Sequence, residues 1–193
     1  MKFAKHLIAL AAVAAVAVPM SAQAESDINT VAAAAQSASA RLNFRVTVPK
    51  VIYLQVGTGT AFTDVTTVDE VLFALTATQV TTAGAVAASG AGVTARIMGN
   101  GGNVSLTANG ASGGLANATA GTSIAWSDIT GTSSSTSLPH PAIGNGAAGA
   151  ASSLTAVAGI VNQTATWTFS YANAATVAAG DYTGQVTYTA ALP

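Results

Sequence analysis

Few residues in this chain belong to types that perform chemistry, and His140 is the first to consider. It is the only histidine after residue 24, and two prolines flank it in the segment Leu138-Pro139-His140-Pro141, which favours an extended loop. A metal site needs several converging ligands, and a general base needs a proton within hydrogen-bond reach. The sequence contains no cysteine that might join the histidine. A structural role within the loop is therefore the favoured interpretation of His140.

Three carboxylates, Asp64, Asp69 and Glu70, lie close together in the sequence. Calcium takes six or more oxygen ligands, and this spacing matches no calcium loop, so a solvated turn is the better interpretation. Serine is frequent, but no GxSxG motif and no partner base accompany it. The glycines at 99–102 lack the Lys-Ser/Thr ending of a phosphate loop. We therefore expect no enzyme, no cofactor and no metal, and a small hydrolase is the weakest hypothesis.

The composition favours a secreted, β-rich protein. Half of the 193 residues are hydrophobic, 7% are charged, and the net charge is −1. Six lysines and arginines cannot form the basic face that a nucleic-acid partner requires. Without cysteine, disulfides and thiol catalysis are excluded. Nineteen glycines, with abundant Thr, Ser and Val, indicate short strands joined by tight turns.

Residues 1–24 have the pattern of a cleaved secretory signal peptide. Lys2 and Lys5 precede an apolar run over residues 7–18, and the segment ends in Ala22-Gln23-Ala24. A membrane anchor is the alternative, but this run falls short of the ~20 residues that span a bilayer. We expect cleavage after Ala24 and export to the periplasm and beyond.

Alternating apolar residues predict strands along the rest of the chain. Trp167, Phe169 and Tyr171 share one face of a strand over residues 166–171, and residues 182–189 follow the same pattern, in a hairpin-like pair with it. Further strands are expected at 41–48, 51–56, 71–75, 93–98, 104–107 and 124–126. Glycine- and serine-rich segments at 99–103, 110–121, 131–137 and 144–153 are expected to be turns and loops. About eight short strands at this spacing predict an all-β sandwich.

The domain boundaries follow from these assignments. After the signal peptide, residues 25–40 form an N-terminal extension that could be a tail or a helical turn. Residues 41–193 are expected to form one sandwich domain of ordinary size. No later segment is long and apolar enough to cross a membrane, and no repeat of fixed period is present.

Both ends of this domain resemble a known family. The segment Leu42-Asn43-Phe44-Arg45-Val46-Thr47-Val48-Pro49-Lys50-Val51-Ile52-Tyr53-Leu54-Gln55 is similar to the N-terminal region of alternate chaperone–usher pilins, the colonization-factor type of fimbrial major subunit. The segment Ala178-Ala179-Gly180-Asp181-Tyr182-Thr183-Gly184-Gln185-Val186-Thr187-Tyr188 resembles the closing strand of the same family, and Ser123-Ile124-Ala125-Trp126 resembles a central one. The closing motif also occurs in spore-coat-U-like domains. The 17 or so residues before Leu42 depart from the family pattern.

The resemblance implies an immunoglobulin-like sandwich that lacks one strand. A neighbouring subunit's N-terminal strand then fills the groove, through main-chain hydrogen bonds and alternate side chains. The donor residues would be Leu42, Phe44, Val46 and Val48, although the same residues would serve equally well in an internal first strand. Self-association, a periplasmic chaperone, an outer-membrane usher and a possible host receptor are the implied partners.

Two functional hypotheses of different classes remain. The first is a structural subunit of an extracellular fibre, a pilus or fimbria on the cell surface. The second is a monomeric secreted or periplasmic binding module that uses its loops like an adhesin. An open groove beside the last strand, or a detached N-terminal strand, would favour the first hypothesis. A concave cluster of exposed aromatic side chains would favour the second.

Overall fold

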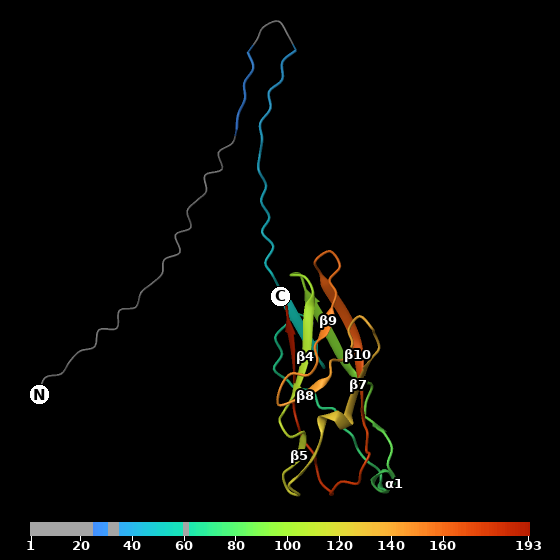
Figure 1. Ribbon diagram of the computed structural model, residues 1–193. Coiled ribbons are helices and arrows are strands. Elements are labelled where there is room, and N and C mark those ends of the chain that lie inside the picture. The colour runs from blue at the N-terminus through green and yellow to red at the C-terminus, as the bar shows by residue number, and fades with distance from the viewer. Residues whose placement is uncertain (1–24, 31–34, 60–61) are drawn as a thin grey trace, which may run out of the picture. The chain divides into compact units, whose positions relative to one another are not determined.

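The computed structural model describes residues 25–30, 35–59 and 62–193, which fall into two units that divide after Val48. The signal peptide expected at residues 1–24, with its cleavage site after Ala24, lies outside the described residues. The second unit, residues 49–193, is an all-β sandwich, as the sequence predicts (Figure 1). It contains eleven described strands where about eight were expected, because five of them are only two or three residues long.

The first sheet is antiparallel throughout. Its strands are β1 (Ile52–Val56), β2 (Val86–Ala87), β3 (Val93–Gly99), β7 (Ile129–Ser133) and β10 (Val161–Tyr171). The long strand β10 pairs with β3 along its first seven residues and with β2 near its end, while β7 pairs with residues 167–171. Strand β1 pairs with β3 only, so it forms an edge of this sheet.

The second sheet is built around β4 (Val104–Gly110). One edge of β4 carries β11 (Val186–Ala191), and the other carries β8 (Ile143–Asn145) and β9 (Ser152–Leu154). A separate two-stranded ribbon consists of β5 (Leu115–Asn117) and β6 (Thr122–Ile124). The expected turn at 99–103 carries the chain from β3 in one sheet to β4 in the other. Gly102, at φ +107°, takes a backbone conformation there that favours glycine.

The core lies between the two sheets, where β3 and β10 of the first sheet face β4 of the second. Ala95 and Ile97 of β3, Val104 and Leu106 of β4, and Trp167 of β10 have no exposed surface. Strand alternation places each of them on an inner face. Trp167, Phe169 and Tyr171 share one face of β10 as predicted. Trp167 and Tyr171 are buried, and Phe169 is half-buried against the core. The Trp167 Nε1–H is satisfied, because it donates to the Leu138 carbonyl at 3.2 Å.

His140 is part of this packing. Its ring meets Trp167 and Phe169 edge-on, with ring centroids 4.9 and 5.1 Å apart. Nε2 lies 2.8 Å from the Tyr188 hydroxyl of β11. Burial lowers the pKa of His140 to about 4 and raises that of Tyr188. The loop histidine is therefore half-buried beside the core, and its contacts connect β10 of the first sheet with β11 of the second.

Several local expectations are wrong. Residues 182–185 lie outside β11, and β10 and β11 belong to different sheets, so they form no hairpin. Their long connection instead passes the ribbon, where Thr183 bridges Ala116. Residues 71–75 alternate in burial but form no strand, and the Leu72 carbonyl accepts only a single described hydrogen bond, from the Ser89 amide. The loop expected at 131–137 begins within β7, and β5 interrupts the one expected at 110–121.

A short helix, α1 (Ala77–Thr81), was not expected from the sequence. Its N-terminus is closed by a capping box, in which the Thr76 hydroxyl accepts from the Gln79 amide and the Gln79 side chain accepts from the Thr76 amide. The Thr-x-x-Gln signature of such a box was present in the sequence. At five residues, however, the helix is too short for apolar periodicity to reveal it.

Candidate binding groove

The first unit contains the residues that were predicted to bind a neighbour. Its described residues, 25–30 and 35–48, form no helix or strand. The strand expected at 41–48 is therefore absent within the chain, although the backbone there runs extended (Figure 1). The apolar side chains remain uncovered, since Leu42 is 66%, Phe44 87%, Val46 86% and Val48 72% exposed. An alternating apolar row that lies in water is a marker of an interaction site.

One ion pair links the two described parts of the first unit. The Arg41 guanidinium donates to both Glu25 carboxylate oxygens, at 2.7 and 2.9 Å. The pair lowers the pKa of Glu25 and raises that of Arg41. Both side chains are well exposed, so the pair contributes little to stability. The expected extension 25–40 thus forms neither helix nor strand in its described residues.

The second unit has one sealed seam between its sheets and one open seam. On the side of β9 and β10, Leu138, Leu154 and Val161 are each at most 2% exposed, so the core is covered there. On the side of β1 and β11, the inward residues Leu54, Val56, Tyr188 and Ala190 contact the core but are only partly buried. The sandwich is therefore sealed along one seam and only partly covered along the other.

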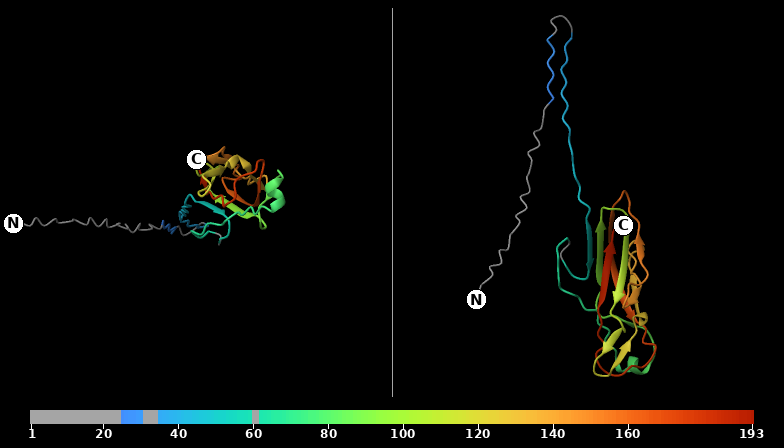
Figure 2. Two further views of the ribbon diagram at one scale, coloured as in Figure 1. Left: turned by 90° about the horizontal axis from the view of Figure 1, so that it is seen from below. Right: turned by 60° about the vertical axis from the view of Figure 1, so that its left-hand side comes forward.

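A groove of about 780 Å³ follows the open seam. Strand β1 forms one wall and the first half of β11 the other, and these two edge strands lie beside each other (Figure 2, right). The lining is mixed, with polar residues such as Gln55, Thr58 and Gln185 beside a set of apolar side chains: Leu54, Val56, Leu115, Trp126, Ile129, Ile143, Phe169, Val186 and Tyr188. Neither β1 nor β11 has a ladder partner on its outer edge among the described strands. A groove with two open strand edges and an apolar floor is suited to an extended peptide.

Trp126 forms the floor at one end of this groove. Its indole packs on Gly110, and a Cβ on Gly184 would lie 2.9 Å from the same ring. Nε1 donates to the Ala111 carbonyl at 2.7 Å, so its polar atom is satisfied and an apolar face remains. At the opposite end, Leu192 and Val51 both approach Gly99, which brings the ends of the two edge strands together.

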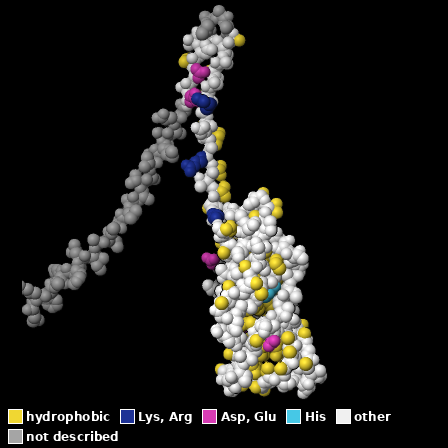
Figure 3. Space-filling view, in the orientation of Figure 1, with side chains coloured by type: hydrophobic (Ala, Val, Ile, Leu, Met, Phe, Trp, Pro, Cys, Tyr) yellow, Lys and Arg dark blue, Asp and Glu magenta, His cyan; other side chains and the backbone are white. Residues whose placement is uncertain are grey.

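Acidic residues stand on the rim. Asp64, Asp69 and Glu70 all line the groove, and they belong to the long loop that follows β1. Charge is sparse elsewhere on the sandwich face seen in Figure 3. In the exposed segment, by contrast, Arg41 and Arg45 alternate with the apolar row. The outward face of that segment and the rim of the groove therefore carry opposite charges.

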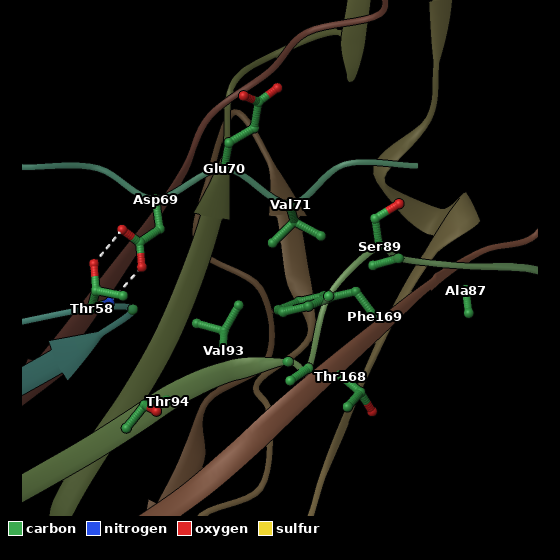
Figure 4. A pocket seen from close by; sticks show the side chains of 15 residues that line it. Thr58, Asp69, Glu70, Val71, Ala87, Ser89, Val93, Thr94, Thr168 and Phe169 are labelled. Atoms are coloured by element: carbon green, nitrogen blue, oxygen red, sulfur yellow. Dashed lines mark hydrogen bonds between the residues drawn. The ribbon is translucent and has the colours of Figure 1, made fainter. Parts of the chain in front are cut away.

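Asp69 also fixes this loop. Its carboxylate accepts hydrogen bonds from the Thr58 amide and, at 2.7 Å, from the Thr58 hydroxyl (Figure 4). These bonds lower the pKa of Asp69. The two residues also line a second hollow of about 520 Å³, together with Val71, Val93 and Phe169. The carboxylate therefore acts as a tether for the acidic rim.

No group of three or more metal-ligating side chains occurs among residues 25–30, 35–59 and 62–193. In the same part of the chain, no helix is long and apolar enough to span a membrane. The sequence predicted an apolar row at residues 42–48 but not the walls of the groove, because those walls depend on which two strands become sheet edges. The signals for the walls were the apolar run at residues 51–56 and the alternation at residues 186–191.

Comparison of the chain with protein-family models, with curated proteins and with solved structures finds no match.

Proposed function

We propose that this chain is the structural subunit of an extracellular fibre, assembled by donor-strand complementation. Residues 42–48 of one copy would occupy the β1–β11 groove of the next, so that each sandwich gains the strand it lacks. The observation that carries this proposal is the coexistence in one chain of an exposed alternating apolar row and a partly covered apolar seam.

The dimensions of the two parts agree. A seven-residue strand is about 20 Å long at roughly 3.3 Å per residue. It can therefore run beside the six residues of β11 and the five of β1. Insertion would give an open strand edge a main-chain partner, and would place Leu42, Phe44, Val46 and Val48 against the floor.

Burial energy and charge favour the same occupant. Covering four side chains of this size contributes roughly 6–12 kcal/mol before the cost of association is subtracted. The alternation that buries the apolar row turns Arg45 outward, toward a rim that carries Asp64, Asp69 and Glu70. Opposite charges of this kind speed association and fix the register.

The proposal includes the surroundings that the sequence resemblance implies. The subunit would be exported through the periplasm, where a chaperone would cover the groove until an usher exchanges it for a donor strand. The sandwich would have an immunoglobulin-like topology, and the assembled fibre would lie on the cell surface. The chain would be a homopolymer subunit with no catalytic role.

A capping experiment tests the proposal. The exported chain, incubated at rising concentration, should form thin fibres visible by negative-stain electron microscopy. A synthetic peptide spanning Arg41 to Pro49 should shorten them, because it occupies free grooves without offering a groove of its own. The same peptide with Phe44→Asp is the matched control and should have no effect. A chain that stays monomeric at high concentration and binds neither peptide would instead favour a monomeric binding module.

A further inference from the structure

The three residues between the exposed segment and β1 are held by one side chain. The Asn100 Oδ1 accepts a hydrogen bond from the Val51 amide at 2.7 Å, and its Nδ2 donates to the Pro49 carbonyl at 2.7 Å. The Asn100 amide in turn donates to the Val51 carbonyl at 3.3 Å. Asn100 belongs to the turn between β3 and β4, so these bonds continue the β1–β3 ladder up to Pro49.

Lys50 strengthens the same attachment. Its Nζ donates to the Pro193 carbonyl at 3.1 Å, and its methylenes lie across Gly101, where a Cβ would fall 2.9 Å from Cγ. Residues 49–51 are thus held by Asn100 and Gly101 of the β3–β4 turn and by the Pro193 carbonyl.

This attachment bears on a question that donor-strand assembly raises. Residues 42–48 end one residue before Pro49, and β1 begins at Ile52. A tight hairpin at 49–52 would bring the segment beside the free edge of its own β1 and close the groove within one copy. Such a turn is normally closed by a hydrogen bond from its fourth amide to its first carbonyl, here from Ile52 to Pro49. In the structure the Pro49 carbonyl already accepts from Asn100 Nδ2, which holds it toward β3.

We propose that Asn100 is a positioning residue that prevents the chain from filling its own groove and commits residues 42–48 to a second copy. This inference rests on the proposed function. It assigns the choice between a closed monomer and a fibre to a side chain that belongs to neither the donor segment nor the lining of the groove.

The test compares exported variants by size-exclusion chromatography and electron microscopy. Asn100→Ala removes both bonds, and Asn100→Asp keeps the acceptor for Val51 but repels the Pro49 carbonyl. Both should raise the monomer fraction, by about tenfold for Asn100→Ala because two hydrogen bonds hold the present conformation. These monomers should no longer bind the Arg41 to Pro49 peptide. Asn103→Ala, which alters a different bond of the same turn, is the control and should assemble like the parent.

A chain with three residues, Gly-Asn-Gly, inserted between Val48 and Pro49 distinguishes a failure of the Asn100 inference from a failure of the proposed function. It supplies a turn while Asn100 stays in place, and should give closed monomers. If it does so while both Asn100 variants assemble like the parent, the role of Asn100 is refuted and the proposed function stands. Loss of the β-sheet circular dichroism signal in both Asn100 variants would also refute it, since Asn100 would then serve folding alone. If the parent and the insertion chain are both open monomers that bind no peptide, the proposed function fails.

Discussion

Acidification should weaken the sandwich between pH 6.5 and pH 4 through a single group, His140. Its ring packs between Trp167 and Phe169, and its Nε2 meets the Tyr188 hydroxyl, in a site where burial lowers its pKa to about 4. The unfolded chain holds this proton near the ordinary value of 6.5. Between those values the unfolded state binds more protons, so the free energy of unfolding falls as the pH falls.

The size of the effect follows from the shift. A difference of about 2.5 pKa units corresponds to at most about 3–4 kcal/mol, and roughly half of that is expected because the ring keeps some contact with solvent. This contribution is fully present above pH 6.5 and is lost by about pH 4. Asp69, whose pKa lies below its ordinary 3.8, loses its hydrogen bonds only at lower pH, outside this window.

Urea unfolding followed by tryptophan fluorescence, at pH values from 7 to 4.5, measures this dependence. His140→Phe is the matched control, because it keeps an aromatic ring of similar size but cannot titrate. It should lower stability at pH 7, where the Tyr188 hydroxyl loses its partner, and should flatten the profile below pH 6.5. A parent protein whose stability is constant from pH 6.5 to pH 4.5, or a variant with the same slope as the parent, would refute the reasoning.

Three further predictions concern packing and processing. Trp167→Ala should cost about 3–5 kcal/mol of unfolding free energy, because the side chain has no exposed surface, and a melting temperature within a degree or two of the parent's would contradict this. Gly110→Ala should cost about 1–3 kcal/mol, since the new methyl group overlaps the Trp126 indole, whereas Gly113→Ala, with open space around it, tests the backbone effect alone by chemical denaturation. Exported protein should begin at Glu25, and N-terminal sequencing that still finds Lys2 would overturn the expected cleavage.

The sequence predicts the all-β class because each long strand carries its own evidence. In β10, Trp167 and Tyr171 alternate with threonine and serine, and a strand with one buried face requires this pattern. The turn at 99–103 is equally local, since its glycines and asparagines favour reversal whatever the rest of the chain does. These features depend on neighbours in the sequence and can be read from it.

Features that depend on distant partners could not be predicted in the same way. Residues 42–48 and 51–56 are both rich in apolar, strand-forming residues, yet only the second segment forms a strand, because β3 supplies its ladder. The predicted hairpin between β10 and β11 failed for a similar reason. Alternation reports that a strand has a buried face, but it does not report in which sheet that face lies. The groove exists because β1 and β11 are edge strands without a partner among the described strands, and no local sequence pattern predicts which strands become edges.

The most direct test of the account compares two variants of the exposed segment. One carries a new charge within the apolar row, and the other carries the same charge on the opposite face. Phe44→Asp would put an unpaired carboxylate into the apolar floor of a neighbouring groove, which is strongly unfavourable. Because Phe44 is 87% exposed in a single copy, the monomer should keep its circular dichroism spectrum and melting temperature. Asn43→Asp introduces the same charge on the opposite face of the same segment.

Size-exclusion chromatography of the two variants, at equal concentration beside the parent, gives the answer. The account predicts that Phe44→Asp elutes as a folded monomer and still binds the Arg41 to Pro49 peptide through its intact groove. Asn43→Asp should still assemble, although more slowly than the parent, because its new charge faces the acidic rim. Fibres formed by Phe44→Asp as readily as by the parent, or a Phe44→Asp chain that no longer folds, would contradict the claim that residues 42–48 complete a second copy.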